Sequence, residues 1–165
     1  MTAGIIRNKN PKQEKWDSHF LKEAELAGSM STCNRLNAGA VIVRERRYIS
    51  GGYNGSMVGA DHCDDEGHLI YKGHCIRTVH AEANAIAQAA KFGISIKGAT
   101  MYVTHTCCYD CFKLAVNAGI TKFVFGKHYE NTKYNYFDEA RDLGIIIKQP
   151  PKSLPVGVDP DDYRR

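Results

Sequence analysis

The sequence predicts a layered α/β domain in which helices cover both faces of a sheet. Its second half alternates apolar, β-branched segments with segments of helical periodicity, the pattern typical of such domains. The chain has 165 residues, 43% of them hydrophobic, which is enough to bury one core. We expect one domain at 16–148, a loose arm at 1–15, and an extended proline-rich tail at 149–165.

The first half predicts one helix and one hairpin. Residues 16–30 place apolar side chains at every third or fourth position, which marks one face of a helix. The apolar run at 38–43, a short polar turn and a strand at 48–54 then form a hairpin. Residues 55–77 show no period, and irregular segments of this length are commonly functional or held by a ligand.

The second half supplies the alternation of helices and strands. A helix is predicted at 80–93 and ends at Gly93. The elements that follow are a strand at 100–106, a helix at 108–119, a strand at 121–126, a helix at 134–143 and a short strand at 144–148.

Composition narrows the class of protein. No apolar run reaches the roughly 18 residues of a membrane span, and the N-terminus has no apolar signal block, so we expect a cytoplasmic protein with no membrane partner. The net charge of +4 is scattered along the chain and does not favour a nucleic-acid partner. In a reducing compartment the six cysteines are better explained as metal ligands or reactive thiols than as disulfides.

His80, Cys108 and Cys111 form a candidate metal site. The two cysteines stand three positions apart at the start of a predicted helix, so their sulfurs share one face, and a helix N-terminus favours the thiolate form that binds metal. His80 begins another predicted helix, and the strand at 100–106 would let the two helix starts meet. Three protein ligands leave one tetrahedral position for water, which is typical of catalytic zinc.

Glu82 follows His80 by two positions, too close to bind the same ion easily but well placed to move protons at the open position. The sequence therefore predicts hydrolytic substitution at zinc. Each half of the pattern alone has another interpretation, because CYDC also suits a redox pair and a lone histidine is usually packed or solvated. The combination favours zinc chemistry.

The motifs HAE and CYDC match the signature of the zinc nucleobase deaminases. With STCNR, GGYNGS, HCDDEGH, GHCIRTVHAEANAI and GATMYVTHT, the chain resembles the deoxycytidylate (dCMP) deaminases, especially the bacterial members encoded in late-competence operons. The resemblance covers about 16–147. It implies a cytidine deaminase-like α/β/α fold with a five-stranded mixed sheet, and hydrolysis of dCMP to dUMP and ammonia with Glu82 as proton carrier.

The resemblance also implies substrate contacts. Asn54 would hold the sugar and base edge, although Asn-Gly after a strand is also an ordinary turn dipeptide. The backbone amide of Ala81, at a helix start, would bind the pyrimidine carbonyl. Ser56, His105 and Tyr129 are candidates for contacting the nucleotide and its 5′-phosphate, and each of them could instead be a packing residue.

Cys107 occupies the position where the family pattern has a proline. Proline would fix the backbone at the first helical turn, whereas cysteine adds a third sulfur beside the site. Only Cys108 and Cys111 have two residues between them, which favours that pair. A Cys107 and Cys111 pair stays open as an alternative.

A second candidate cluster lies in or before the irregular segment and consists of Cys33, Cys63, His68 and Cys75. Soft ligands in a segment with little apolar content suggest a structural zinc that replaces a missing core. His62 and His74 each adjoin a cysteine and are rival fourth ligands. The alternative is that the cysteines are buried free thiols.

Assembly and regulation are implied by the resemblance alone: a homo-oligomer, often a hexamer, with dCTP and dTTP as effectors bound with Mg²⁺. The loop after Asn54 reads GSMVGAD and lacks the proline of some regulated members, which weakens the regulatory expectation. The alternative substrates are another cytosine nucleotide or an adenine in tRNA. Two other classes stay open: a catalytically idle, zinc-stabilised binding module of competence machinery, and a thiol oxidoreductase that uses the cysteines at 107, 108 and 111.

Overall fold

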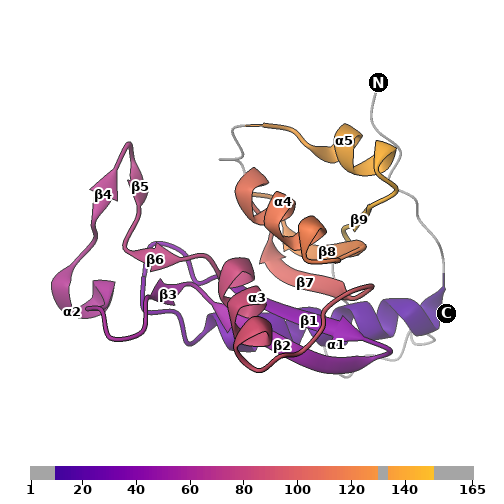
Figure 1. Ribbon diagram of the computed structural model, residues 1–165, viewed down its shortest axis with the longest axis horizontal. Coiled ribbons are helices and arrows are strands. Elements are labelled where there is room, and N and C mark those ends of the chain that lie inside the picture. The colour runs from indigo at the N-terminus through magenta and orange to yellow at the C-terminus, as the bar shows by residue number, and fades with distance from the viewer. Residues whose placement is uncertain (1–9, 130–133, 151–165) are drawn as a thin grey trace, which may run out of the picture.

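A central five-stranded sheet organises the protein, whose computed structural model describes residues 10–129 and 134–150 (Figure 1). The strands run in the order β2-β1-β7-β8-β9. Their bounds are β1 (Gly39–Arg44), β2 (Arg47–Tyr53), β7 (Thr100–His105), β8 (Lys122–Lys127) and β9 (Ile146–Lys148). The main helices are α1 (Pro11–Gly28), α3 (Ala81–Lys91), α4 (Tyr109–Asn117) and α5 (Phe137–Asp142).

The sheet is mixed, as predicted. Strand β1 pairs antiparallel with β2 and with β7, whereas β7, β8 and β9 are parallel. The two parallel connections pass through α4 and α5, because parallel neighbours need a crossover that returns the chain to the same edge. The predicted five-stranded α/β architecture is therefore confirmed.

Helices cover both faces of this sheet, because its central strands bury alternate side chains on each face. In β1, Val41 and Val43 pack with residues of α1, and Ala40 and Ile42 belong to the core formed with α3, α4 and α5. Strands buried on both sides read as continuous apolar runs, which is why 38–43 could be recognised from the sequence.

The first helix begins earlier than expected, and residues 11–15 of the predicted arm are helical. Asn10 caps the helix by accepting a hydrogen bond from the Gln13 amide at 3.3 Å, and Pro11 occupies the first turn, where its lack of an N–H costs nothing. This turn is mainly polar, so it carried no apolar period. The rest of the predicted arm, 1–9, and the tail from 151 lie outside the described residues.

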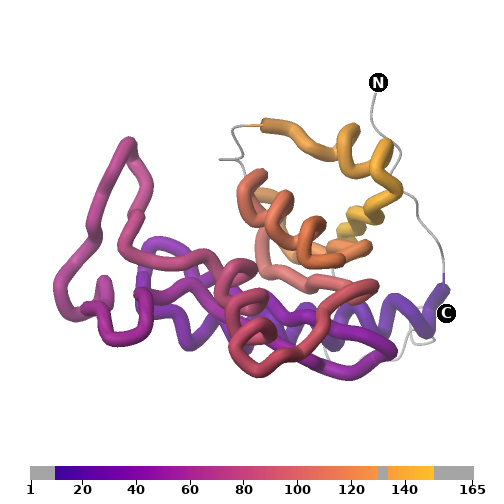
Figure 2. The backbone as a smooth tube through the Cα atoms, viewed as in Figure 1, coloured from indigo at the N-terminus to yellow at the C-terminus, as the bar shows by residue number. Residues whose placement is uncertain are grey.

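Residues 55–77, expected to be irregular, contain short elements that project away from the sheet (Figures 1 and 2). Strands of two residues have no period that a sequence could reveal. The elements are β3 (Gly55–Ser56), which pairs with β6 (Thr78–Val79), the helix α2 (Cys63–Glu66), and the hairpin β4 (Ile70–Tyr71) and β5 (His74–Cys75).

Gly52 lets β2 approach α3 closely, and α3 begins beside the candidate metal site. A Cβ at this position would lie 2.5 Å from the Ala85 backbone nitrogen and 2.6 Å from the Ala81 carbonyl oxygen. We expect Gly52→Ala to lower the free energy of unfolding by about 1–3 kcal/mol in urea denaturation, because backbone cannot yield. The control is Gly51→Ala, whose Cβ would meet mainly the movable Tyr48 ring, with the Ala40 carbonyl oxygen farther away at 3.2 Å. Equal losses in both variants would contradict this account.

Asp17 forms a buried polar network on the α1 face of the sheet. Its side chain is fully buried and accepts hydrogen bonds from the Tyr102 hydroxyl at 2.8 Å, the Gln13 amide at 2.9 Å and the Lys148 ammonium at 2.8 Å. Burial opposes ionisation, but the hydrogen bond from Lys148, together with Gln13, Lys122 and Tyr102, holds the pKa of Asp17 below its ordinary value. The network thus joins α1 to β7 and β9.

Replacing Asp17 with asparagine should destabilise the protein by roughly 3–5 kcal/mol at pH 7, because two lysines lose their buried partner. A carboxyl with a depressed pKa contributes stability that is full above about pH 4 and is lost as the pH falls through its folded value. The gap between wild type and Asp17→Asn should therefore narrow in denaturation curves below about pH 4. A gap that is constant from pH 7 to pH 3 would contradict an ionised Asp17.

Candidate active site

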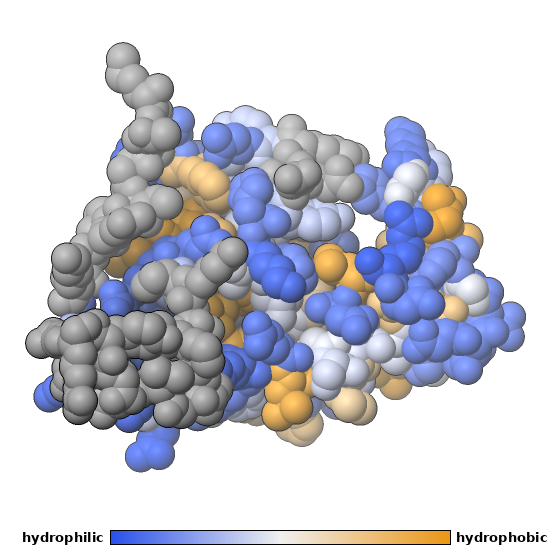
Figure 3. Space-filling model, turned by 180° about the vertical axis from the view of Figure 1, so that it is seen from behind, coloured by the Kyte–Doolittle hydropathy of each residue, from blue (hydrophilic) through white to orange (hydrophobic). Residues whose placement is uncertain are grey.

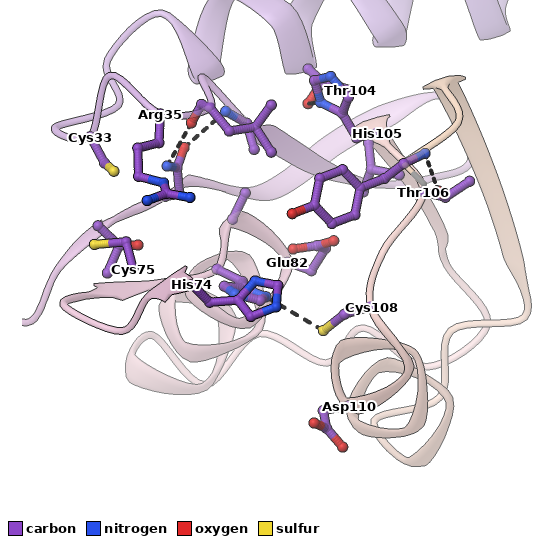
Figure 4. A pocket seen from close by; sticks show the side chains of 18 of the residues that line it. Cys33, Arg35, His74, Cys75, Glu82, Thr104, His105, Thr106, Cys108 and Asp110 are labelled. Carbon is purple, nitrogen blue, oxygen red and sulfur yellow. Dashed lines mark hydrogen bonds between the residues drawn. The ribbon is translucent and has the colours of Figure 1, made fainter. Parts of the chain in front are cut away.

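One cavity of about 800 Å³ lies where the loop before β1, the start of α3, the end of β7 and the start of α4 meet (Figure 4). Glu82, Cys108 and His105 line it at one side, and Cys33 and Cys75 line it at the other. Both clusters of candidate metal ligands therefore border the same cavity. A volume of this order is typical of small-molecule sites.

The predicted ligands His80, Cys108 and Cys111 come together. His80 and Cys108 are the N-cap residues of α3 and α4, and both have extended backbones. The His80 Nδ1 lies 3.5 Å from each of the two sulfurs. A tetrahedral zinc ion with bonds of about 2.1–2.3 Å separates its ligand atoms by roughly 3.4–3.8 Å, so this donor set fits zinc.

The charges in this cluster suit a metal. Hydrogen bonds from Cys111 and His80 lower the pKa of the Cys108 thiol to about 4, which favours its thiolate form. The hydrogen bond with Cys108 in turn raises the pKa of His80 to about 9. A thiolate is the form that binds metal, and the proton on His80 would be released when a cation takes its place.

Glu82 lies in the first turn of α3 and is only 8% exposed. Burial raises the pKa of its carboxyl, although the backbone amide at the helix start and the charge of His80 oppose the shift. The side chain therefore lies beside the cluster in a setting that favours holding a proton, which is what a proton carrier requires.

Cys107 is turned away from the cluster and into the core. It is 3% exposed, its carbonyl oxygen accepts a hydrogen bond from the Tyr136 hydroxyl at 2.7 Å, and its sulfur lies 3.3 Å from that hydroxyl. Burial raises the pKa of the thiol. The geometry therefore favours Cys108 and Cys111 as the ligand pair over Cys107 and Cys111.

Four of the five predicted substrate contacts line the cavity: Asn54, Ala81, His105 and Tyr129. The Asn54 amide is already engaged, since it accepts from the Ala38 amide at 2.8 Å and donates to the Leu36 carbonyl at 2.7 Å. It therefore positions the loop before β1 as well as facing the cavity. Ser56 is not among the residues that line the cavity; it lies in β3, paired with Thr78.

The sequence did not single out several residues that line the cavity. Arg35 and Lys72 bring positive charge to it, and Arg35 donates a hydrogen bond to the Gly73 carbonyl at 3.0 Å. Arg35 stands in the motif STCNR, but nothing in that motif revealed the chemistry of the arginine. The other cavity-lining polar or aromatic residues of this kind are Tyr71, Thr78, Thr104, Thr106, Tyr109, Asp110 and Tyr134.

The second predicted cluster also assembles. The donor atoms of Cys33, Cys63, His68 and Cys75 all lie within 4.8 Å of one another, with 3.5 Å between the sulfurs of Cys63 and Cys75 and 3.6 Å between the Cys33 sulfur and the His68 Nδ1. Four donors at these separations fit closed tetrahedral coordination. We call these four residues the accessory cluster. The rival ligands His62 and His74 are not part of it.

Thiol chemistry in the accessory cluster also suits a cation. Although burial opposes it, hydrogen bonds from the Arg77 backbone and from Cys63 lower the pKa of Cys75 to about 6. Burial and the contact with Cys75 raise the pKa of Cys63 to about 12. A cation would release the proton that Cys63 otherwise keeps.

Comparison with known proteins agrees with this site. The family model for the cytidine and deoxycytidylate deaminase zinc-binding region matches residues 14–127. The chain is 44% identical to ComE operon protein 2 of Bacillus subtilis over 136 residues, which cover 81% of this chain and 70% of that protein. It is 36% identical to the deoxycytidylate deaminase of Enterobacteria phage T2, and the match covers 82% of this chain and 92% of the phage protein.

A solved structure shows the same fold. The dCMP deaminase from cyanophage S-TIM5, crystallised in complex with dCMP and dUMP, superposes with a TM-score of 0.71 at 28% identity and covers 86% of this chain and 99% of that one. The cytidine deaminase-like α/β/α fold is thus confirmed. Over the parts of the chain that the structure describes, none of the helices is long and apolar enough to cross a membrane.

Proposed function

Because this chain belongs to the family that carries the cytidine and deoxycytidylate deaminase zinc-binding region, we propose that it hydrolyses dCMP to dUMP and ammonia. One observation carries the proposal: an imidazole and two thiols converge on one point in a cavity, beside a buried carboxyl that does not belong to the donor set. A structural metal site has no need of such a carboxyl, so this observation argues against an idle binding module.

His80, Cys108 and Cys111 would hold a zinc ion, which supplies an activated water when bound. Glu82 would take a proton from the attacking water and deliver it to N3 of the cytosine as the hydroxyl adds to C4. It would then take the proton of that new hydroxyl and pass it to the amino group, which leaves as ammonia while the C4 carbonyl of dUMP forms. Its burial keeps bulk water from competing for these protons. As zinc ligands, Cys108 and Cys111 would both be thiolates, and they would keep this side of the cavity fixed.

Residues around the cavity would bind the rest of the nucleotide. The Ala81 backbone amide, at the start of α3, is suited to the pyrimidine carbonyl, and Asn54 to the sugar and base edge. His105 and Tyr129 are proposed to contact the nucleotide at the end of β7 and after β8. Arg35 replaces Ser56 as the proposed 5′-phosphate contact, because a guanidinium binds phosphate through paired N–H donors.

Finer properties follow from family resemblance and belong to the same proposal. The accessory cluster would hold a second, structural zinc ion. The protein would act in the cytoplasm as a homo-oligomer, with a hexamer as the expected form, and dCTP and dTTP with Mg²⁺ would be its effectors. The domain would extend over 16–148, together with the earlier turns of α1.

A screen of ammonia release tests the proposed reaction. The purified protein is assayed with dCMP, dCTP, CMP and deoxycytidine, and its zinc content per chain is measured in parallel. We expect the highest kcat/KM for dCMP and two zinc equivalents per chain, one for each cluster. Turnover of an adenosine in tRNA without turnover of any free nucleotide would overturn the substrate, and zinc binding without any deamination would overturn the activity.

A further inference from the structure

We propose that the accessory cluster determines how strongly the protein prefers a phosphorylated substrate. It would do so by fixing Arg35 at the cavity, together with the β4 and β5 hairpin. This inference rests on the proposed deaminase function. The accessory metal would then act on the binding of the nucleotide's anionic end and leave the chemistry at C4 unchanged. Asn34 is the residue that links the metal site to this task.

Three consecutive side chains join the loop before β1 to the projecting segment. The Cys33 sulfur lies 3.6 Å from the His68 Nδ1, the Asn34 Oδ1 lies 3.1 Å from the His68 Nε2, and Arg35 donates to the Gly73 carbonyl at 3.0 Å. Three consecutive residues therefore have three roles: Cys33 is a proposed metal ligand, Asn34 is the hydrogen-bond partner of a ligand, and Arg35 is a cation at the cavity. One residue, Asn34, thus connects His68 to Arg35.

Asn34 determines which nitrogen of His68 faces the cluster. When the His68 Nε2–H donates to the Asn34 Oδ1, the lone pair of Nδ1 points toward the sulfurs of the accessory cluster. Partners of this kind orient histidine ligands, and their loss typically lowers metal affinity by about 10- to 100-fold. Asn34 is thus a positioning residue for the accessory metal.

The hairpin depends on this cluster because apolar packing gives it little support. Leu69, Ile70 and Tyr71 are 51%, 49% and 58% exposed, and hydrophobic side chains on this projecting part are visible at the surface in Figure 3. The ligand Cys75 and the Arg35 contact at Gly73 bind the hairpin to the rest of the domain. Without the ligands, Lys72 and Gly73 would have few contacts to hold them at the cavity.

Arg35 faces the cavity that also contains Glu82. Both residues line it, and in the view of Figure 4 the Arg35 side chain lies between the Cys33 and Cys75 pair and Glu82. Since a guanidinium is charged at every relevant pH and strongly favours phosphate oxygens, its position decides how well a 5′-phosphate is bound. Deoxycytidine lacks that phosphate, so its binding should not depend on where the Arg35 guanidinium lies.

The test compares Asn34→Leu, which removes the acceptor for His68, with Asn34→Asp, which keeps an oxygen there. We expect Asn34→Leu to release one zinc equivalent to a chelator at least tenfold more readily than wild type. Its KM for dCMP should rise about fivefold or more, as expected for a misplaced charge-assisted contact, with the kinetics on deoxycytidine unchanged within about twofold. Asn34→Asp should restore zinc retention and the KM for dCMP.

A double-mutant cycle tests whether Asn34 affects dCMP binding through Arg35. Arg35→Gln should itself raise the KM for dCMP, and adding Asn34→Leu to it should have no further effect, because coupled residues are non-additive. The affinities of dCMP and deoxycytidine for the Glu82→Gln protein, measured by calorimetry, give the same comparison without turnover. Because Glu82→Gln keeps both clusters, zinc retention can be read in the same samples.

Three results would overturn the inference: unchanged zinc retention in Asn34→Leu, equal losses for dCMP and deoxycytidine, or additive effects of the two substitutions. Equal losses would mean that the accessory metal only stabilises the fold. Failure of the proposed function has a different signature, because wild type would then neither turn over dCMP nor bind it more tightly than deoxycytidine.

Discussion

Glu82→Gln should lower kcat for dCMP by about 10²- to 10⁴-fold, the usual contribution of a positioned general acid and base. Glutamine has the same shape but cannot take a proton from water or deliver one to N3. Because burial already disfavours the charged carboxylate at this position, the neutral amide should not reduce stability. The measurements are steady-state ammonia release, zinc content and thermal unfolding of the variant.

The control for Glu82→Gln is Asp110→Asn, which changes another carboxylate that lines the cavity. Asp110 lies in the first turn of α4, forms an ion pair with Lys113 at 2.8 Å, and has a side chain that is 90% exposed. We expect its kcat to change less than about threefold, since an exposed ion pair contributes little. Retained deamination in Glu82→Gln, or equal losses in the two variants, would remove the proton-carrier role from Glu82.

The parts of the fold that the sequence predicted are those whose signals are local. In β7, α4 and β8 the apolar periods switch at each boundary, and the predicted strands agree with the structure to within about one residue. The start of α1 was missed because its first turn is polar, and the pairs β4 with β5 and β3 with β6 were missed because two residues carry no period. The prediction was therefore limited by how short an element is, more than by whether it is a helix or a strand.

The same distinction applies to the candidate site. HAE and CYDC mark helix starts, so the sequence alone could place the proposed ligands His80, Cys108 and Cys111 on two turns that meet. The cavity role of Arg35 was not predictable, because it depends on contact with Gly73, far along the chain. Likewise, only the folded chain reveals that the Asn54 amide holds the loop before β1.

The choice between Cys107 and Cys108 as metal ligand gives the second large prediction. Cys108 is the N-cap of α4 and its sulfur lies 3.5 Å from His80, whereas the residue before it packs its sulfur against Tyr136. A ligand must be deprotonated, and burial makes this difficult for Cys107. These two neighbouring residues therefore differ in their expected roles: Cys108 is the proposed metal ligand, and Cys107 is a core residue.

Cys108→Ser should lose the catalytic zinc equivalent and reduce kcat/KM for dCMP by about 10³-fold or more, since two remaining ligands hold zinc poorly and the activated water is lost with it. Cys107→Ser should keep both zinc equivalents and most of the activity, while its free energy of unfolding falls by about 1 kcal/mol because a hydroxyl replaces a buried thiol. Metal analysis, ammonia release and denaturation distinguish the two variants. If Cys107→Ser lost zinc and Cys108→Ser kept it, the ligand pair would be wrong. If chelators left activity intact and the thiols cycled through a disulfide, the chemistry would be that of a redox protein.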